Sequence, residues 1–219
     1  FRVDTVVITG EKRYTEAEIR EVSGVKDGDN LFLLNKYQVI RNIAEALPYV
    51  ELEETRVQRK LPDTLLIEIK ECGDPLAWAQ DGTIWLVSPG GKIVEQRNTV
   101  GDYPTIDGCR LLAPSVGTLI ALDTENDTRR QSLLELLAAL EAADKLGEVD
   151  AIHIGNAAYL TMDYMGRFSV ELNYDADFAY KLRTLNAILA SGKIQENMTG
   201  TFNMRGEDGK TNFIQNSVK

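Results

Sequence analysis

Histidine and cysteine are scarce in this sequence, which has one histidine and two cysteines among 219 residues. A zinc site built from spaced His and Cys ligands needs more of both residue types than the chain provides. His153 lies in the alternating segment 151–154, a pattern typical of a strand residue rather than of a catalytic base. Cys72 and Cys109 fit either a disulfide outside the cytoplasm or two separate thiols, so both alternatives stay open.

Positive charge is also in short supply. The formal net charge is −10 and the isoelectric point is near 4.7. Nucleic-acid binding depends largely on Lys and Arg neutralising phosphates, so this balance argues against a nucleic-acid partner. It also disfavours a charge-driven anchor on anionic lipid.

Long apolar runs are missing too. No segment approaches the ~20 residues that a spanning helix needs, and none has the order of a signal peptide. The chain starts at Phe1 with a strand-like pattern, so we expect a segment upstream, and a membrane anchor is one such segment.

The composition is that of a folded globular protein, with 43% hydrophobic and 26% charged residues. At ~150 residues per domain, the length fits one large or two modest domains. The composition changes near residues 72–75, which we take as the boundary.

Residues 1–71 show the order of elements most clearly. A Val- and Thr-rich strand over 2–9 precedes a helix that Thr15 and Glu18 begin as a capping box and Gly24 ends. Asn35 caps a second helix, which ends before Pro48. Alternating segments at 50–57 and 65–70 flank a turn, so the pattern predicts β-α-α-β-β.

The rest of the chain predicts a β-rich domain over 72–205 with a mostly antiparallel sheet and two packed helices, which makes the whole fold α+β. Hairpins run from 77 to 95, and the first of them turns at Asp81-Gly82. Trp78 and Trp85 are expected as core residues. One helix has Thr128 and Gln131 as its capping box and Gly147 as its stop. The other predicted elements are strands at 149–154, 159–164 and 168–174, a helix capped by Asp175 or Asp177 that ends at Gly192, a last strand at 199–205, and a turn and tail at 206–219.

Two short motifs resemble those of known enzymes, but the predicted elements around them do not fit a catalytic role. Ser23-Gly24-Val25-Lys26 has the spacing of penicillin-recognising enzymes, but it stands at a predicted helix exit. Gly209-Lys210-Thr211 lacks the first glycine of a phosphate-binding loop. Nothing marks a catalytic, cofactor or metal site, so we expect a protein that is not an enzyme.

Three segments of the first 71 residues resemble a known domain. They are residues 28–36, 47–51 and 56–69, the last of which contains the turn Leu61-Pro62-Asp63-Thr64-Leu65. In order and spacing they resemble the polypeptide-transport-associated (POTRA) domain of the FtsQ/DivIB cell-division family. The hairpins, the leucine-rich helix and the closing strands are similar to that family's second, β-rich domain.

The resemblance implies a single-pass cell-membrane protein at the division septum, with this region outside the membrane. It implies a divisome scaffold that binds FtsB/DivIC-type and FtsL-type partners, with a septal peptidoglycan synthase as a further partner. It also implies help in regulating septal peptidoglycan synthesis. Cys72 and Cys109 would then face an oxidising space.

Partner binding in that family implies strand addition at the end of the chain, where a partner segment pairs with a sheet edge. Arg205 would pair with a partner carboxylate, and Phe202 or Phe213 would supply an anchor. The alternative to partner binding is that the Arg205 side chain is solvated and that the chain is frayed from Gly206 onward. The residues implied for partner binding are Thr201, Phe202, Asn203, Met204, Arg205, Gly206 and Phe213.

Two other functions stay open at this point. POTRA units also occur in polypeptide-transport and envelope-assembly proteins, which receive unfolded chains by strand pairing. An enzyme acting on cell-wall material is the third class.

Overall fold

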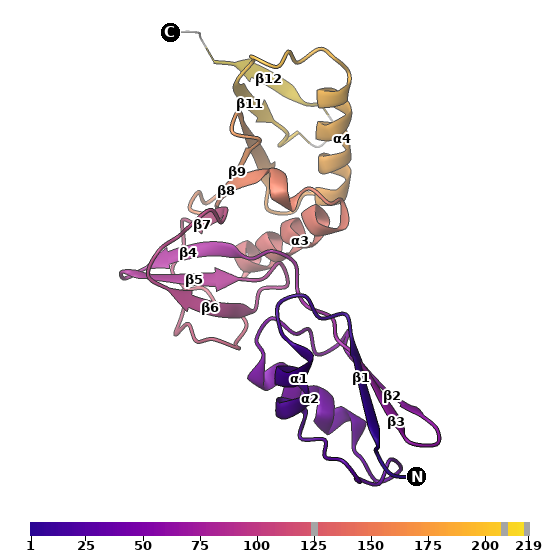
Figure 1. Cartoon of the computed structure of the whole chain (residues 1–219). Helices are drawn as coiled ribbons and strands as arrows, with labels where there is room; N and C mark the ends of the chain where they lie inside the picture. Colours follow the sequence, from indigo (N-terminus) through magenta and orange to yellow (C-terminus); the bar gives the residue numbers. More distant parts are fainter. Residues whose placement is uncertain (124–126, 207–209, 217–219) are drawn as a thin grey trace. The chain divides into compact units, whose positions relative to one another are not determined.

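The computed structural model describes residues 1–123, 127–206 and 210–216 (Figure 1). Its chain divides into two compact units, Phe1–Gly73 and Asp74–Lys219, each with its own hydrophobic core. The division lies within residues 72–75, two residues after the end of the predicted first domain at 71. Among the described residues, no helix combines the length and apolar character needed to span a membrane.

The first unit confirms the predicted β-α-α-β-β order. Its three-stranded sheet has the order β1-β3-β2, so β1 and β2 are the outer strands. β1 pairs with β3 in parallel, and β2 pairs with β3 antiparallel. The elements are β1 (Thr5–Thr9), α1 (Glu16–Ser23), α2 (Lys36–Ala46), β2 (Arg56–Lys60) and β3 (Thr64–Glu68).

Both helices of this unit begin as the sequence predicts. The Thr15 side chain accepts a hydrogen bond from the Glu18 N–H while the Glu18 carboxylate accepts one from the Thr15 N–H. Gly24 then ends α1 with a left-handed φ of 75°, a conformation that favours glycine. The Asn35 side chain accepts hydrogen bonds from the N–H groups of Tyr37 and Gln38 at the start of α2.

The predicted strand at 50–57 is largely wrong, because β2 begins only at Arg56. The alternation of apolar and acidic residues there imitates a strand. Instead, the Thr55 N–H and hydroxyl both donate to the Glu51 carbonyl, which closes a turn before β2. Local hydrogen bonding of a threonine side chain therefore outweighs the alternating pattern.

The second unit is a nine-stranded sheet with α3 and α4, in the order β12-β11-β10-β9-β8-β7-β4-β5-β6. Five of its eight neighbouring pairs are antiparallel, as predicted. The elements are β4 (Leu76–Gln80), β5 (Thr83–Val87), β6 (Ile93–Arg97), β7 (Thr105–Asp107), α3 (Thr128–Ala142), a 3-10 turn (Leu146–Glu148), β8 (Val149–His153), β9 (Tyr159–Tyr164), β10 (Phe168–Asn173), α4 (Phe178–Ala190), β11 (Gly200–Asn203) and β12 (Asn212–Gln215).

One apolar row crosses eight strands of this sheet, from β12 to β5. Its members are cross-strand neighbours and form part of one core with the leucines of α3 and the apolar face of α4. The row consists of Phe213, Phe202, Val170, Met162, Ile152, Ile106, Trp78 and Trp85. Trp78 is 1% exposed, which confirms its predicted core role. On the other face, the side chains of β8–β11 next to this row are mostly polar and half-buried, whereas Ala77 on β4 and Leu86 on β5 are buried.

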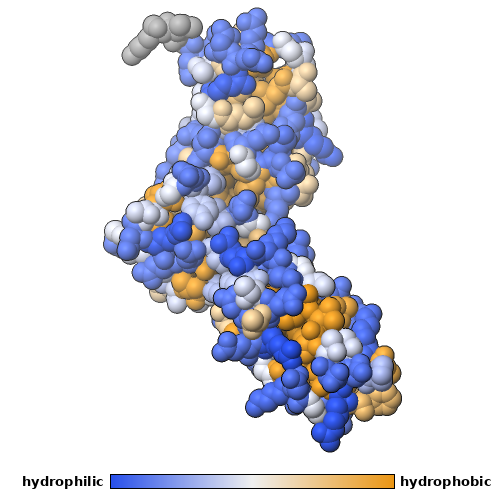
Figure 2. All heavy atoms as spheres, viewed as in Figure 1, coloured by the Kyte–Doolittle hydropathy of each residue, from blue (hydrophilic) through white to orange (hydrophobic). Residues whose placement is uncertain are grey.

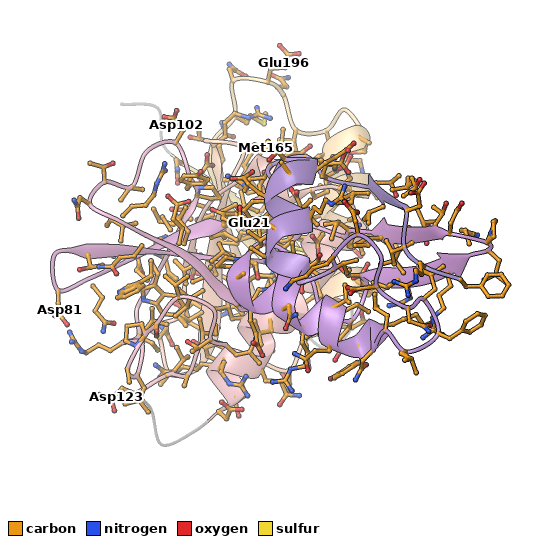
Figure 3. All side chains as sticks on the ribbon, turned by 60° about the horizontal axis from the view of Figure 1, so that its bottom comes forward. Glu21, Asp81, Asp102, Asp123, Met165 and Glu196 are labelled. Atoms are coloured by element: carbon orange, nitrogen blue, oxygen red, sulfur yellow. The ribbon has the colours of Figure 1, made fainter. Side chains whose placement is uncertain are left out.

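The β4–β5 hairpin turns at Asp81 and Gly82, as predicted from the Asp-Gly pair. Both residues have positive φ, 51° and 77°. Figure 3 labels Asp81 at the tip of this hairpin, where the Arg110 guanidinium lies 2.6 Å from its carboxylate.

The capping prediction for α3 is wrong by one residue. Asp127 is the N-cap, so Thr128 already has helical backbone and cannot serve as a cap. The helix also ends at Ala142 rather than at Gly147. Asp144 takes the left-handed conformation, with φ of 54°, and its backbone N–H donates to the Glu141 carbonyl. For α4, the Asp177 side chain accepts from the Tyr180 N–H, which selects Asp177 over Asp175.

Candidate protein-interaction edge

The C-terminal strand pair ends one side of the large sheet. β11 pairs in parallel with β10, and β12 pairs antiparallel with β11. The sequence predicts a turn and tail over 206–219, but the structure places residues 212–215 in the sheet. Residues 207–209 and 217–219 of the predicted tail lie outside the described residues. Thr201–Asn203 therefore lies inside the sheet, and β12 is the outer strand.

Gly200 allows the two strands to approach. A Cβ atom at this position would lie 2.3 Å from the Ile214 carbonyl oxygen and 2.8 Å from a ring carbon of Phe213. Both distances are shorter than real contacts, so a larger residue would push β12 away. Sequence reasoning missed this residue, although a glycine next to a β-branched pair in a predicted strand is a signal of close backbone approach.

Three aromatic rings attach β12 to the core. Phe202 lies between the other two, with ring centroids 5.2 Å from Phe168 and 4.7 Å from Phe213. Phe202 is fully buried and Phe213 is half-buried. Phe202 is thus unavailable as an anchor for a partner, and Phe213 holds its own strand in place.

The direction of the backbone groups on β12 follows from its pairing. The Asn216 N–H donates to the Thr199 carbonyl at 2.9 Å, on the side facing β11. Backbone groups alternate in direction along an antiparallel strand, so those of Asn212 and Ile214 also face β11. The N–H and C=O groups of Phe213 and Gln215 therefore face outward, where the sheet of the described chain has no further strand. Such a row is a template for pairing with another chain.

Arg205 is already paired within the unit. Its Nε lies 3.1 Å from the Glu171 carboxylate, and its guanidinium carbon lies 4.3 Å from the centre of the Tyr159 ring. A partner carboxylate would therefore have to compete with Glu171 for the Arg205 guanidinium. Its side chain is also 38% exposed, so it stays partly solvated.

Other predicted residues have structural roles beside this edge. Met204 is buried, and its N–H donates to the Glu171 carbonyl. The Gly206 carbonyl accepts a hydrogen bond from Lys181 at 2.8 Å. Thr201 and Asn203 are half-buried on the polar face. Their roles in partner binding stay predictions. The side chains on β12 that sequence reasoning did not select are the exposed Asn212, Ile214 and Gln215.

The two cysteines belong to different units. Cys109 is a half-buried thiol, with Sγ 3.5 Å from the Ile154 carbonyl and 3.5 Å from the Arg129 guanidinium. Cys72 is half-buried next to the end of the first unit. A disulfide between them stays a prediction.

His153 bridges two carboxylates on neighbouring strands. Its Nδ1 lies 2.9 Å from Asp107 on β7, and its Nε2 lies 3.1 Å from Asp163 on β9. Both carboxylates only accept hydrogen bonds, so the imidazolium, with two N–H donors, is the form that satisfies both. Partial burial lowers the pKa of His153, but the hydrogen bonds that its ring donates to Asp163 and Asp107 outweigh this effect, and the net pKa is raised.

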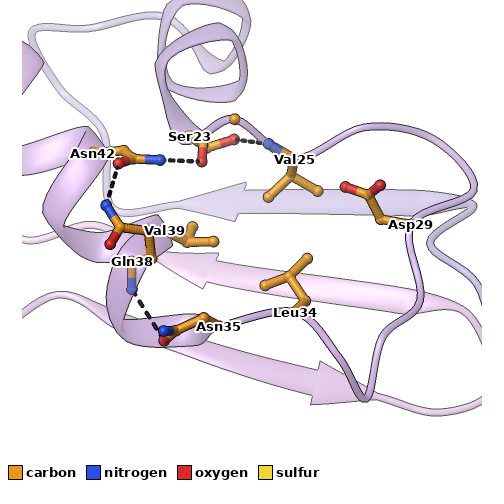
Figure 4. A pocket seen from close by; sticks show the side chains of 9 residues that line it. Ser23, Val25, Asp29, Leu34, Asn35, Gln38, Val39 and Asn42 are labelled. Carbon is orange, nitrogen blue, oxygen red and sulfur yellow. Dashed lines mark hydrogen bonds between the residues drawn. The ribbon is translucent and has the colours of Figure 1, made fainter.

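Ser23, the serine of the Ser-x-x-Lys motif at residues 23–26, is the last residue of helix α1. Its hydroxyl donates to the Arg20 carbonyl and accepts from the Val25 N–H. Figure 4 shows Ser23 at the rim of a small hollow beside the amide side chains of Gln38 and Asn42. Its hydroxyl is committed to the backbone, so it lacks the partner base that a nucleophilic serine needs.

Comparison with known proteins adds to this geometry. Residues 1–71 match the family model described as POTRA domain, FtsQ-type. The cell division protein DivIB of Clostridium botulinum is 22% identical over 98% of this chain and 82% of its own length. The cell division protein FtsQ of Geotalea daltonii is 31% identical over 74% of this chain and 57% of its own length.

A solved structure of the major extracytoplasmic domain of DivIB from Geobacillus stearothermophilus matches 57% of this chain and 99% of its own, at 17% identity and a TM-score of 0.34. A score this low does not establish a common overall fold, so the relationship rests on the sequence matches.

Fold and matches together define a protein built from an FtsQ-type POTRA domain followed by a β-rich domain with a nine-stranded sheet. Over most of its length the chain is similar to the FtsQ/DivIB family of bacterial cell-division proteins.

Proposed function

We propose that this chain is a non-enzymatic scaffold of the divisome that captures its partners by strand addition along the outer edge of β12. The single observation that supports this proposal is the outward direction of the Phe213 and Gln215 backbone groups at the end of the sheet. A partner strand would supply the missing hydrogen bonds, and its side chains would meet the exposed Ile214 and Gln215.

The proposed partners are extracytoplasmic segments of FtsB/DivIC-type and FtsL-type proteins, with a septal peptidoglycan synthase as a further partner. Through them the chain would help to regulate septal peptidoglycan synthesis. The region would lie outside a membrane that the protein crosses once. Support comes from the sequence similarity to the cell division proteins DivIB and FtsQ.

In this proposal the partner binds to β12, which is one strand further out than the strand predicted from the sequence. A proline at Thr201 would break the pairing between β11 and β12, because the Thr201 backbone faces Ile214. Loss of binding in that variant would come from detachment of β12 and not from a missing donor at the outer edge. A sharper test therefore acts on β12 itself.

The experiment compares two substitutions at one position. Gln215→Pro removes an outward N–H and leaves the inward bonds of Ile214 and Asn216 in place, whereas Gln215→Ala removes only the side chain. We expect Gln215→Pro to weaken binding of the soluble partner segment by at least about tenfold in calorimetry and Gln215→Ala by less than about threefold. Equal affinity for Gln215→Pro and the unsubstituted chain, with unchanged circular dichroism, would contradict strand addition at β12.

A further inference from the structure

Five large apolar or aromatic side chains of the first unit stand more than half exposed. The exposed fractions are 82% for Leu33, 64% for Phe1, 61% for Tyr37, 57% for Leu61 and 54% for Phe32. We call these five residues the apolar pole. Single exposed apolar residues are normal on protein surfaces, but a group at one place marks an interaction surface.

Hydrogen bonds bring the three segments of the apolar pole together. The Leu31 N–H donates to the Phe1 carbonyl, and the Phe1 and Phe32 rings meet edge to face at 5.2 Å. The Asp4 N–H donates to the Asp63 carbonyl, which ties the first residues to the β2–β3 turn that carries Leu61. Figure 1 shows the chain start, the loop before α2 and this turn at the same end of the unit.

The guanidinium of Arg59 completes the link between the loops. Its Nη2 donates to the carbonyls of Phe32, at 3.3 Å, and Leu34, at 2.8 Å. The loop 30–34 is thus held from β2 as well as from the chain start. These contacts hold the backbone of the loop, while the side chains of Phe32 and Leu33 project into solvent.

Strand pairing does not suit this surface, because its backbone groups are already used. The N–H groups of Leu33 and Leu34 both donate to the Asn30 carbonyl, and the Phe32 N–H donates to the Asn30 side chain. What the pole offers is therefore side chains alone. In Figure 2 hydrophobic residues are visible on the surface of this unit.

Basic residues adjoin three of the five pole residues. Arg2 follows Phe1, Lys36 precedes Tyr37 and Lys60 precedes Leu61, and all three basic side chains are exposed. Asp4 and Asp63 are the carboxylates beside them, so the local charge stays near neutral although the whole chain carries −10. Aromatic and aliphatic tips next to Lys and Arg are the composition that settles in the headgroup layer of a bilayer.

We propose that the apolar pole inserts its side chains into the interfacial layer of a phospholipid membrane. The apolar side chains supply the affinity, and Arg2, Lys36 and Lys60 approach the phosphates. In the cell this contact rests on the proposed function, because it requires the first unit to lie against the membrane surface. It would fix the orientation of that unit on the bilayer.

A bilayer fits these observations better than a protein partner does. Five projecting side chains on three segments of the chain need an occupant that deforms around each of them, and the interfacial layer does so. A folded partner would need a matching set of pockets. Capture of a division protein through these residues is therefore an alternative outcome of the test.

The test is co-sedimentation of the chain with vesicles of zwitterionic phosphatidylcholine, and separately of phosphatidylcholine with phosphatidylglycerol. We expect a partition constant on the order of 10⁴ M⁻¹, similar to that of a single myristoyl chain, on both vesicle types and in high salt. The double variant Phe32→Ser, Leu33→Ser should bind about a hundredfold more weakly. The matched control is Leu112→Ser, Leu119→Ser, whose side chains are 57% and 68% exposed in the second unit; it should bind within about twofold of the unsubstituted chain.

Three outcomes would overturn the inference. They are no binding to either vesicle at about 1 mM lipid, equal losses in the pole and control variants, or loss of a division partner instead of lipid in the pole variant. Gln215→Pro should leave vesicle binding unchanged. A failure of strand addition at β12 is thereby distinguishable from a failure of membrane contact at the pole.

Discussion

At the scale of single residues, Gly200 controls the outer strand. Replacing it by alanine places a methyl group 2.3 Å from the Ile214 carbonyl oxygen. We expect Gly200→Ala to lower the free energy of unfolding of the second unit by about 1–3 kcal/mol and to increase hydrogen exchange of the β12 amides. Gly147→Ala is the control, because nothing lies within 4 Å of a Cβ there. Slow, unchanged exchange in β12 of Gly200→Ala would show that the strand tolerates the methyl group.

Glu71 is the residue that closes the first unit. Its carboxylate accepts hydrogen bonds from the backbone N–H groups of Lys12, at 3.0 Å, and Arg13, at 3.1 Å. Backbone donors lose these partners when the carboxylate is removed, so we expect Glu71→Ala to lower the free energy of unfolding of this unit by about 2 kcal/mol. Denaturant titration measures the change.

The control for Glu71 is another glutamate of the same unit. Glu45 forms an exposed pair with Arg41 one helical turn away. Removing it by Glu45→Ala should cost no more than about 0.5 kcal/mol. Similar costs for the two variants would mean that the backbone contacts of Glu71 add nothing beyond an ordinary surface pair.

At the scale of elements, the sequence is informative where a side chain acts on its own neighbours. The Thr15 box, the Asn35 cap and the Asp81-Gly82 turn all act over two or three residues, and the predicted elements there are confirmed. Strand 50–57 fails because one threonine hydroxyl bonds back to Glu51.

The site was less predictable because its edge depends on distant contacts. β12 is four residues long, and its place depends on Gly200 and on the stacking of Phe213 over Phe202. An alternation of apolar and polar residues over only four positions is too short to predict a strand. The sequence predicts the binding strand at 199–205, whereas the outer strand of this sheet is β12.

His153 links three strands, β7, β8 and β9, in a pH-dependent way. Its folded-state pKa is raised above the ordinary histidine value by Asp163 and Asp107. The stability it contributes is therefore fully present below the unfolded-state pKa, near ~6.5, and is lost as the pH rises through the raised folded-state value.

The measurement is the unfolding temperature of the second unit from mildly acidic to mildly alkaline pH. We expect a decline in this window for the unsubstituted chain and a flatter profile for His153→Gln, which cannot carry the charge. Asp150, which lies on the same strand and has no contact with His153 among the bonds of the described residues, supplies the control Asp150→Asn. An identical decline in His153→Gln would assign the pH dependence to other groups.

At the scale of the whole molecule, the two cores are separate hydrophobic clusters. The first lies within Phe1–Gly73 and the second within Asp74–Lys219, and neither cluster includes a residue of the other unit. Units with separate cores are expected to unfold as separate cooperative transitions. A calorimetric scan should therefore resolve two.

The variants above assign these transitions. Glu71→Ala should move only the transition of the smaller unit, by roughly 8–16 °C for a loss of about 2 kcal/mol in a unit of 73 residues. Gly200→Ala should move only the other one, and by less per kcal/mol because that unit is larger. The isolated fragment 1–73 should unfold at the temperature of the first transition. A single transition that both variants shift together would mean that the units unfold as one cooperative body.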